Sequence, residues 1–398
     1  MSIRNSNSQP LYPVLFAVSI FHLMNDTLQS VLPALFPIIE AKLHLNYSDL
    51  GYIIFCNYIS AAIMQPVIGA YTDKHPVKYL LFIGACFSCF GIYLFSTADA
   101  YSQLLVGAVS VGIGSSIFHP EASRIVVWSA SARKGLSQSI FQIGGNAGQA
   151  LGPLLILLLF KTTDSEGNSF LLIFAVCAVF ISLAVSKWHA GEINKQKALK
   201  KKVDTSTKKL TRTQKIGLAI IIAISLGRSW YSTGITGYYA LYLMKEANMN
   251  FQNAQFHVFV FMIFAAFGTF AGGPIADRFG KKRVLIWSIL FALPFTSILS
   301  FIPSPYSYIV LACSGFFLVS GFAVALIYLF GLIPGRTGWV SGIMFGLAFG
   351  LGGVGSILFG KIGDAFGLST MMFVCSLIPL IGLLVFFLPD ENVPDSGQ

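Results

Sequence analysis

Polar and ionisable side chains recur inside apolar stretches of this chain, and their spacing defines the first candidate chemistry. One set follows the spacing i, i+3, i+4, i+7 and therefore shares one face of a helix: His22, Asn25, Asp26 and Gln29. Asp26 falls near the middle of its apolar run, where an unpaired charge costs about 2.5–3.5 kcal/mol. A hydrogen bond between packed helices would explain such a face. A polar stripe that lines a cavity, with Asp26 binding and releasing a proton, is the favoured interpretation.

A second polar stretch covers residues 115–153. His119, Glu121 and Arg124 come first, and Pro120 between them removes a backbone donor that a helix would use. Glu121 and Arg124 have opposite charges at i, i+3 and can partly neutralise each other, although Arg124 could also extend to the membrane interface. The next apolar run carries four amides on one helical face: Gln138, Gln142, Asn146 and Gln149. We predict His119 and Glu121 as proton-coupling candidates, and Arg124, Gln138, Gln142 and Asn146 as cavity residues.

A third candidate is Arg228, which lies near the middle of a later apolar run with Tyr231 and Tyr238 along a similar face. A midplane arginine needs a counter-charge or water, so a cavity role is favoured. An arginine with nearby tyrosines could hold an anionic, phosphonate-like substrate. In a proton-coupled carrier a carboxylate must alternate between its charged and protonated forms, and hydration and neighbouring charges control that balance.

Other chemistry is not indicated. Cys86 and Cys89 form a CxxC pair, but it falls inside an apolar run, where small packing residues are the expected interpretation. No metalloprotease, phosphate-loop or nucleophile-elbow motif occurs in a suitable context, which argues against an enzyme. We expect no cofactor, no metal site and no catalytic residue. A sensor is not favoured either, because no signalling domain is attached.

The elements that must position these residues are membrane-spanning helices. Of the 398 residues, 55% are hydrophobic and 11% charged, whereas a soluble domain carries about 25% charged residues. A transmembrane helix needs roughly 20 apolar residues. Twelve runs meet this requirement, with approximate bounds 11–39, 49–71, 78–97, 102–127, 135–160, 169–187, 215–244, 252–275, 283–302, 306–332, 338–360 and 369–388. The first is too long for a cleavable signal and is expected to stay as a helix.

The basic residues indicate the orientation of these helices. Most of the 26 Lys and Arg fall in alternate loops, ten of them between Lys187 and Lys215. This is the positive-inside pattern, and it predicts both termini in the cytoplasm. The net charge of +10 is therefore explained by topology and contact with the lipid bilayer, and no nucleic acid partner is expected.

Two loop sequences reveal an internal duplication. They lie 204 residues apart, each at the inner end of a predicted span, and their key positions are Gly69, Asp73 and Lys74, and Gly273, Asp277, Arg278 and Gly280. This predicts an all-α membrane protein with twelve helices in two pseudo-symmetric six-helix bundles. The bundles would cover residues 1–187 and 215–398, joined by a basic cytoplasmic linker at 188–214. The same offset places Asp26 and Arg228 at near-equivalent midplane positions, where the two charges could face one central cavity.

Several motifs together resemble one known family. The two loops resemble the signature of the major facilitator superfamily, although Pro76 and Val77 depart from it in the first copy. Residues 22–30, 118–124 and 138–146, with 252–280 and 334–355, resemble the fosmidomycin resistance protein family within it. Gly148, Gly152 and Pro153 are also similar to the antiporter motif of drug/proton exchangers. One departure is that Phe330 and Gly331 stand where the family carries Gln-Glu.

The resemblance implies a monomeric transporter of the bacterial inner membrane that works by alternating access. It would export small organic molecules such as drugs, driven by inward proton flow. The residues themselves support a carrier but not its direction, so a proton-coupled uptake symporter and an exporter of an endogenous metabolite stay open.

Overall fold

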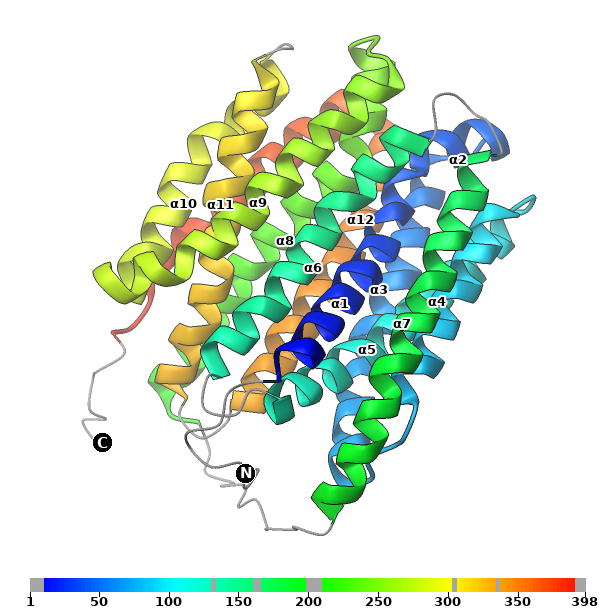
Figure 1. The fold of residues 1–398 in the computed structure, drawn as a ribbon. Helices are drawn as coiled ribbons and strands as arrows, with labels where there is room; N and C mark the ends of the chain where they lie inside the picture. Colours follow the sequence, from blue (N-terminus) through cyan, green and yellow to red (C-terminus); the bar gives the residue numbers. More distant parts are fainter. Residues whose placement is uncertain are drawn as a thin grey trace. The chain divides into compact units, whose positions relative to one another are not determined.

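The computed structural model describes residues 11–129, 134–159, 166–197, 210–302, 306–333 and 337–390 (Figure 1). Every regular element among these residues is helical, so the predicted all-α fold is confirmed. The first half contains α1 (Tyr12–Ala34), α2 (Phe36–Leu43), α3 (Tyr47–Lys74), α4 (Leu80–Ser96), α5 (Tyr101–Ser129), α6 (Lys134–Leu159) and α7 (Glu166–Lys197).

The second half contains α8 (Arg212–Glu246), α9 (Phe251–Phe279), α10 (Lys281–Ile298), α11 (Ser307–Leu332) and α12 (Thr337–Leu377). Two 3-10 segments, η1 (Leu299–Phe301) and η2 (Ile378–Phe387), extend α10 and α12. Thr211 begins α8 with a capping box, because its hydroxyl accepts a hydrogen bond from the Gln214 backbone N–H while the Gln214 side chain accepts one from the Thr211 N–H.

The described helices account for the predicted membrane crossings. Ten segments are long and apolar enough to span a bilayer, and the shorter α4 is also apolar. The last segment, Gly350–Phe387, contains a break at Gly367, whose φ of +83° is a conformation that glycine adopts without strain. Split at Gly367, it supplies two crossings, as expected from the predicted spans at 338–360 and 369–388. Within the described part of the chain this is consistent with twelve crossings.

The chain forms two compact units, residues 1–45 with 52–203, and residues 46–51 with 204–398. In the first unit α1 packs along α6, and α4 packs against both α5 and α7. In the second unit α9 and α11 form one close pair and α8 and α12 another. Of the predicted linker at 188–214, the first residues belong to α7 and the last to α8, while residues 198–209 lie outside the described part of the chain, so the linker itself stays a prediction.

The contact between α1 and α6 is close because α6 presents glycine to it. A Cβ atom on Gly144 would collide with the backbone carbonyl of Ser19, and one on Gly148 with that of Leu23. Small residues let two membrane helices approach until their backbones touch. This approach brings the polar face of α1 within hydrogen-bonding reach of the α6 backbone.

Helix α7 differs from its predicted extent. It was expected to end near residue 187, but it continues to Lys197. The added turns bury Ile193 and His189, which are 0% and 1% exposed, and the His189 ring lies 5.2 Å from that of Trp128 on α5. The added stretch contains Glu192, Asn194 and Lys195 and few apolar residues, so hydropathy alone does not mark it as part of the bundle.

Candidate functional site

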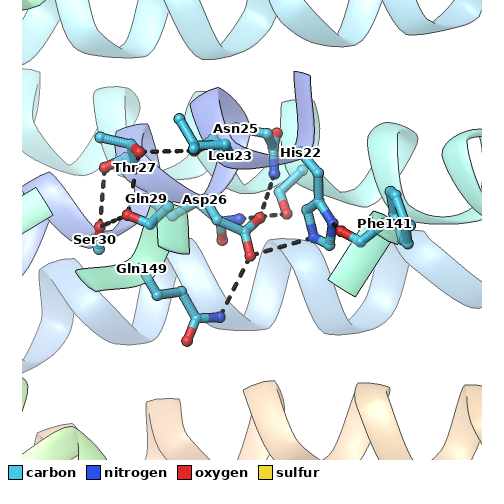
Figure 2. A network of polar contacts seen from close by, with 11 residues as sticks. His22, Leu23, Asn25, Asp26, Thr27, Gln29, Ser30, Phe141 and Gln149 are labelled. Carbon is cyan, nitrogen blue, oxygen red and sulfur yellow. Dashed lines mark hydrogen bonds and ion pairs between the residues drawn. The ribbon is translucent and has the colours of Figure 1, made fainter. Parts of the chain in front are cut away.

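Asp26 lies at the centre of a buried polar network in the first unit (Figure 2). Its side chain and that of His22 are each 5% exposed, and His22 Nε2 lies 3.4 Å from Asp26 Oδ2. Asn25 Nδ2 donates to Oδ1 at 3.0 Å, and Gln149 Nε2 on α6 donates to Oδ2 at 3.4 Å. Both carboxylate oxygens therefore have polar partners, as a charge out of contact with water requires.

Helix α6 fixes the orientation of His22. Its Nδ1 lies 2.8 Å from the backbone carbonyl of Phe141, and its ring stacks on the Phe141 ring with centroids 4.0 Å apart. A Cβ on Gly145 would collide with the Cε1 and Nε2 atoms of the same ring. The imidazole is therefore held between an aromatic face and a bare helix backbone, with Nε2 directed at Asp26.

His119 on α5 completes the cluster. Its ring centroid lies 5.6 Å from that of His22. One ligand atom from each of His22, Asp26 and His119 lies within 4.8 Å of the others. This spacing suits a shared proton and could also hold a cation. Our expectation of no metal stays a prediction.

The remainder of the α1 stripe makes a second line of hydrogen bonds. Gln29 Nε2 donates to Ser115 Oγ on α5 at 2.8 Å. Thr27 and Ser30 donate to the backbone carbonyl of Gly148 at 3.1 and 3.3 Å. Ser115 and Thr27 are not among the site residues that the sequence predicts, although Thr27 lies beside the stripe on α1.

Glu121 belongs to a separate buried cluster. Arg124 Nη1 lies 2.6 Å from Glu121 Oε1, and Arg124 Nη2 donates to Thr72 Oγ1 on α3 at 2.9 Å. His189 Nδ1 on α7 lies 3.8 Å from Glu121 Oε2. The sequence predicts His119 and Glu121 together as proton-coupling candidates. In the structure His119 lies beside His22, whereas Glu121 pairs with Arg124. His189 was missed because it follows the predicted end of its span.

The other predicted residues of the first unit are less engaged. Gln142 and Asn146 are partly exposed. The side chains of Gln138, Asp73 and Lys74 lie outside the described part of the structure. Gly69 faces Pro120, with room for an ordinary contact at 3.5 Å.

In the second unit the loop motif ends α9. Gly280 has a φ of +91° at the junction with α10, which explains the glycine at that position. Arg278 lies over the Phe279 ring at 5.3 Å, and Gly273 has open space where a Cβ would be. Asp277 precedes Arg278 in the last turn of α9.

Arg228 lies near the middle of α8 and is 8% exposed. Its guanidinium carbon lies 4.5 Å from the centroid of the Phe322 ring on α11, and Nη2 donates to Ser225 Oγ at 3.3 Å. Tyr231 and Tyr238 are both fully buried, and the Tyr238 hydroxyl donates to the backbone carbonyl of Ser356 at 2.8 Å. The predicted facing of Asp26 and Arg228 stays a prediction, since they belong to different units.

Comparison with known proteins places this arrangement in a family. The model of the Major Facilitator Superfamily matches residues 15–252 and 218–398. The chain is 39% identical over 384 residues to the uncharacterized MFS-type transporter YfnC of Bacillus subtilis, covering 96% of this chain and 94% of that protein. It is 36% identical over 385 residues to the fosmidomycin resistance protein of Escherichia coli, with the same shares covered.

Solved structures agree on the fold. A bacterial homologue of the human lysosomal transporter Spinster, in an inward-facing and occupied conformation, superposes with a TM-score of 0.78 at 15% identity. The match covers 94% of this chain and 96% of that structure. An integral membrane protein with a carrier fold is thus expected from both comparisons. The chain belongs to the Major Facilitator Superfamily of transporters, within the family of the fosmidomycin resistance protein.

Proposed function

We propose that this protein is a proton-coupled exporter of small organic molecules, fosmidomycin among them, that works by alternating access in a bacterial inner membrane. The observation that carries the proton coupling is the Asp26 network. A carboxylate on a side chain that is 5% exposed and within 3.4 Å of an imidazole can hold or release a proton as its surroundings change. Intramembrane carboxylates with such partners characterise proton relays.

The outward direction and the substrate are supported by a relative. The Escherichia coli protein that shares 36% of its residues with this chain is named for resistance to fosmidomycin. Resistance carried by a membrane transporter is most simply explained by removal of the drug from the cell. Uptake and export of an endogenous metabolite are the alternative activities, and the experiment below distinguishes them.

Arg228 supports an anionic substrate. Between residues 212 and 388 the only acidic residues are Glu246, Asp277 and Asp364, and Glu246 is separated from Arg228 by about 27 Å along α8. Among the described residues Arg228 forms no ion pair. A buried guanidinium gains most from a carboxylate, phosphate or phosphonate, which it can bind through two parallel hydrogen bonds.

The test is proton movement in liposomes that hold the purified protein and a trapped pH dye, with fosmidomycin added as the probe. We expect a drug-dependent pH change that Asp26→Asn abolishes without preventing membrane insertion. Asp99→Asn is the matched control. Asp99 is an exposed acid, and within the described part of the chain it forms an ion pair with Lys42 alone, at 3.0 Å. An Asp26→Asn protein that moves protons at the wild-type rate would rule out Asp26 as the coupling site.

A separate variant tests whether the substrate is anionic. Arg228→Gln removes the charge and keeps a polar side chain, so the loss of charge-assisted hydrogen bonds, about 1.5–3 kcal/mol, should raise the KM for fosmidomycin about ten- to hundredfold. An unchanged KM would show that the drug does not bind Arg228. Drug accumulation inside right-side-out vesicles, rather than extrusion, would indicate uptake.

A further inference from the structure

We infer that the coupling proton is held jointly by His22 and Asp26, between Nε2 and Oδ2, and that helix α6 senses its presence through the His22 ring. Calling this the coupling proton rests on the proposed function. The sequence singled out Asp26, His119 and Glu121 for proton coupling. The structure assigns the role of partner to His22 and a positioning role to Gly145.

The hydrogen bond made by Nδ1, on the side of the ring away from Asp26, determines which tautomer the neutral His22 adopts. A backbone carbonyl can only accept, so Nδ1, which lies 2.8 Å from the Phe141 oxygen, must carry a hydrogen. In the neutral imidazole the other nitrogen, Nε2, is then a lone pair. That lone pair faces Asp26 Oδ2 across 3.4 Å. Without a further proton, two acceptors oppose each other.

One proton resolves this opposition, whichever atom carries it. On Nε2 it gives an imidazolium paired with a carboxylate, and on Oδ2 it gives a carboxylic acid that donates to a neutral imidazole. In both cases the pair holds one exchangeable proton and has no net charge. When the proton leaves, the pair becomes negative and its central contact becomes repulsive.

Neither side chain can easily turn away from that repulsion. Asp26 is held by Asn25 at Oδ1 and by Gln149 at Oδ2. The His22 ring is stacked on Phe141, contacts Phe118 with centroids 5.2 Å apart, and rests on the backbone at Gly145. Figure 2 shows Asp26 between His22 and Gln149, with Phe141 beyond the ring. Loss of the proton therefore introduces electrostatic repulsion at the contact between α1 and α6. This repulsion provides a physical route from proton release to movement of the two helices.

Two further helices contribute the other titratable groups around the pair. Among the described residues Asp26 interacts electrostatically with His119 on α5 and with Tyr58 on α3, besides His22. Helix α6 contributes two uncharged groups, the Phe141 carbonyl and the Gln149 amide. A titration of the pair must therefore be compared with that of His119.

The pairing can be tested without any substrate. Imidazole nitrogens labelled with ¹⁵N give NMR signals that distinguish N–H from a lone pair, and the six histidines can be assigned by single replacement, His22→Asn for the site itself. We expect Nδ1 of His22 to stay protonated at every pH while Nε2 alone titrates. We also expect Asp26→Asn to move the midpoint of that step by at least about one pH unit. An Nε2–H tautomer at high pH, or the same midpoint in both proteins, would overturn the inference.

The role of α6 is tested by a pair of glycine variants. A Cβ at Gly145 meets the His22 ring, whereas the atoms nearest to one at Gly148 belong to the backbone of Leu23. Gly145→Ala should shift the pH profile of fosmidomycin-driven proton movement by about one unit or more, and Gly148→Ala should lower the rate without shifting the profile. Equal shifts in both variants would refute the positioning role of Gly145.

The two proposals fail separately. If the wild-type protein moves no protons with fosmidomycin but His22 and Asp26 titrate as a pair, the proposed function is wrong and the shared proton stands. If proton movement follows the drug but His22 titrates independently of Asp26, the proposed function stands and the shared proton is refuted.

Discussion

The ion pair between Glu121 and Arg124 gives a sharp prediction for stability. The Glu121 side chain is 0% exposed and that of Arg124 is 10% exposed, with 2.6 Å between Oε1 and Nη1. Arg124→Met removes the guanidinium but keeps an apolar stem of similar length. It leaves the carboxylate buried without its cation, and removal of one partner from a buried pair costs about 3–5 kcal/mol.

The assay is thermal unfolding of the purified protein in detergent. For a folding unit of 150–250 residues, 1 kcal/mol corresponds to about 2–4 °C in Tm, so Arg124→Met should lower the Tm by roughly 6–20 °C. The matched control is Lys42→Met, which breaks the pair with Asp99. Those side chains are 53% and 87% exposed, and an exposed pair contributes about 0–1 kcal/mol.

The double variant Glu121→Gln/Arg124→Met completes the cycle. It removes both charges, so no uncompensated carboxylate is left in the protein interior, and most of the lost Tm should return. Two results would refute the reasoning: a Tm for Arg124→Met within the small range of the Lys42→Met control, or a double variant less stable than the single one.

The same double variant separates the two carboxylates as proton carriers. Because Glu121 is paired with Arg124, whereas Asp26 is paired with His22, we expect the double variant to retain fosmidomycin-dependent proton movement. Loss of that movement in a folded double variant would show that the Glu121–Arg124 cluster takes part in proton coupling.

Two further predictions concern packing. Gly112→Ala should lower the free energy of unfolding by about 1–3 kcal/mol, because its Cβ would collide with the Asn57 backbone carbonyl. Gly191→Ala should leave it unchanged, because nothing lies within 4 Å of the added Cβ. Tm measurements on both variants check this, and equal losses would contradict it. Tyr238→Phe should lower stability by about 1 kcal/mol, because the hydrogen bond from the Tyr238 hydroxyl to the Ser356 carbonyl is lost. The KM for fosmidomycin should not change. A raised KM would instead indicate that the Tyr238 hydroxyl contacts the substrate.

Much of the fold and part of the site followed from residue spacing. Helical periodicity placed His22, Asn25 and Asp26 on one face, and in the structure they lie in one network. The i, i+3 spacing of Glu121 and Arg124 correctly predicted their ion pair. Spacing succeeds here because both sets lie on a single helix, whose geometry fixes neighbours three and four residues apart.

The partners that spacing could not reveal come from other helices. The Phe141 carbonyl is a backbone group, and every residue has one, so nothing in the sequence marks it as the acceptor for His22. His189 lies in an extension of α7 beyond the apolar run, where polar and charged residues such as Glu192 and Lys195 hide the continuation of the helix. Whether Tyr231 and Tyr238 line a cavity also depends on packing, which periodicity does not specify.

The α1 network has a consequence for how the protein is made. The groups on α6 that bind His22 and Asp26 lie 119 and 123 residues later in the chain. At 5–20 residues per second, a ribosome needs about 6–25 s to synthesise that stretch. During this interval α1 enters the membrane machinery with its acid unmatched by α6. Until the fifth crossing is synthesised, Asp26 depends for its polar partners on α1 itself, through His22 and Asn25, and on the helices made before α6.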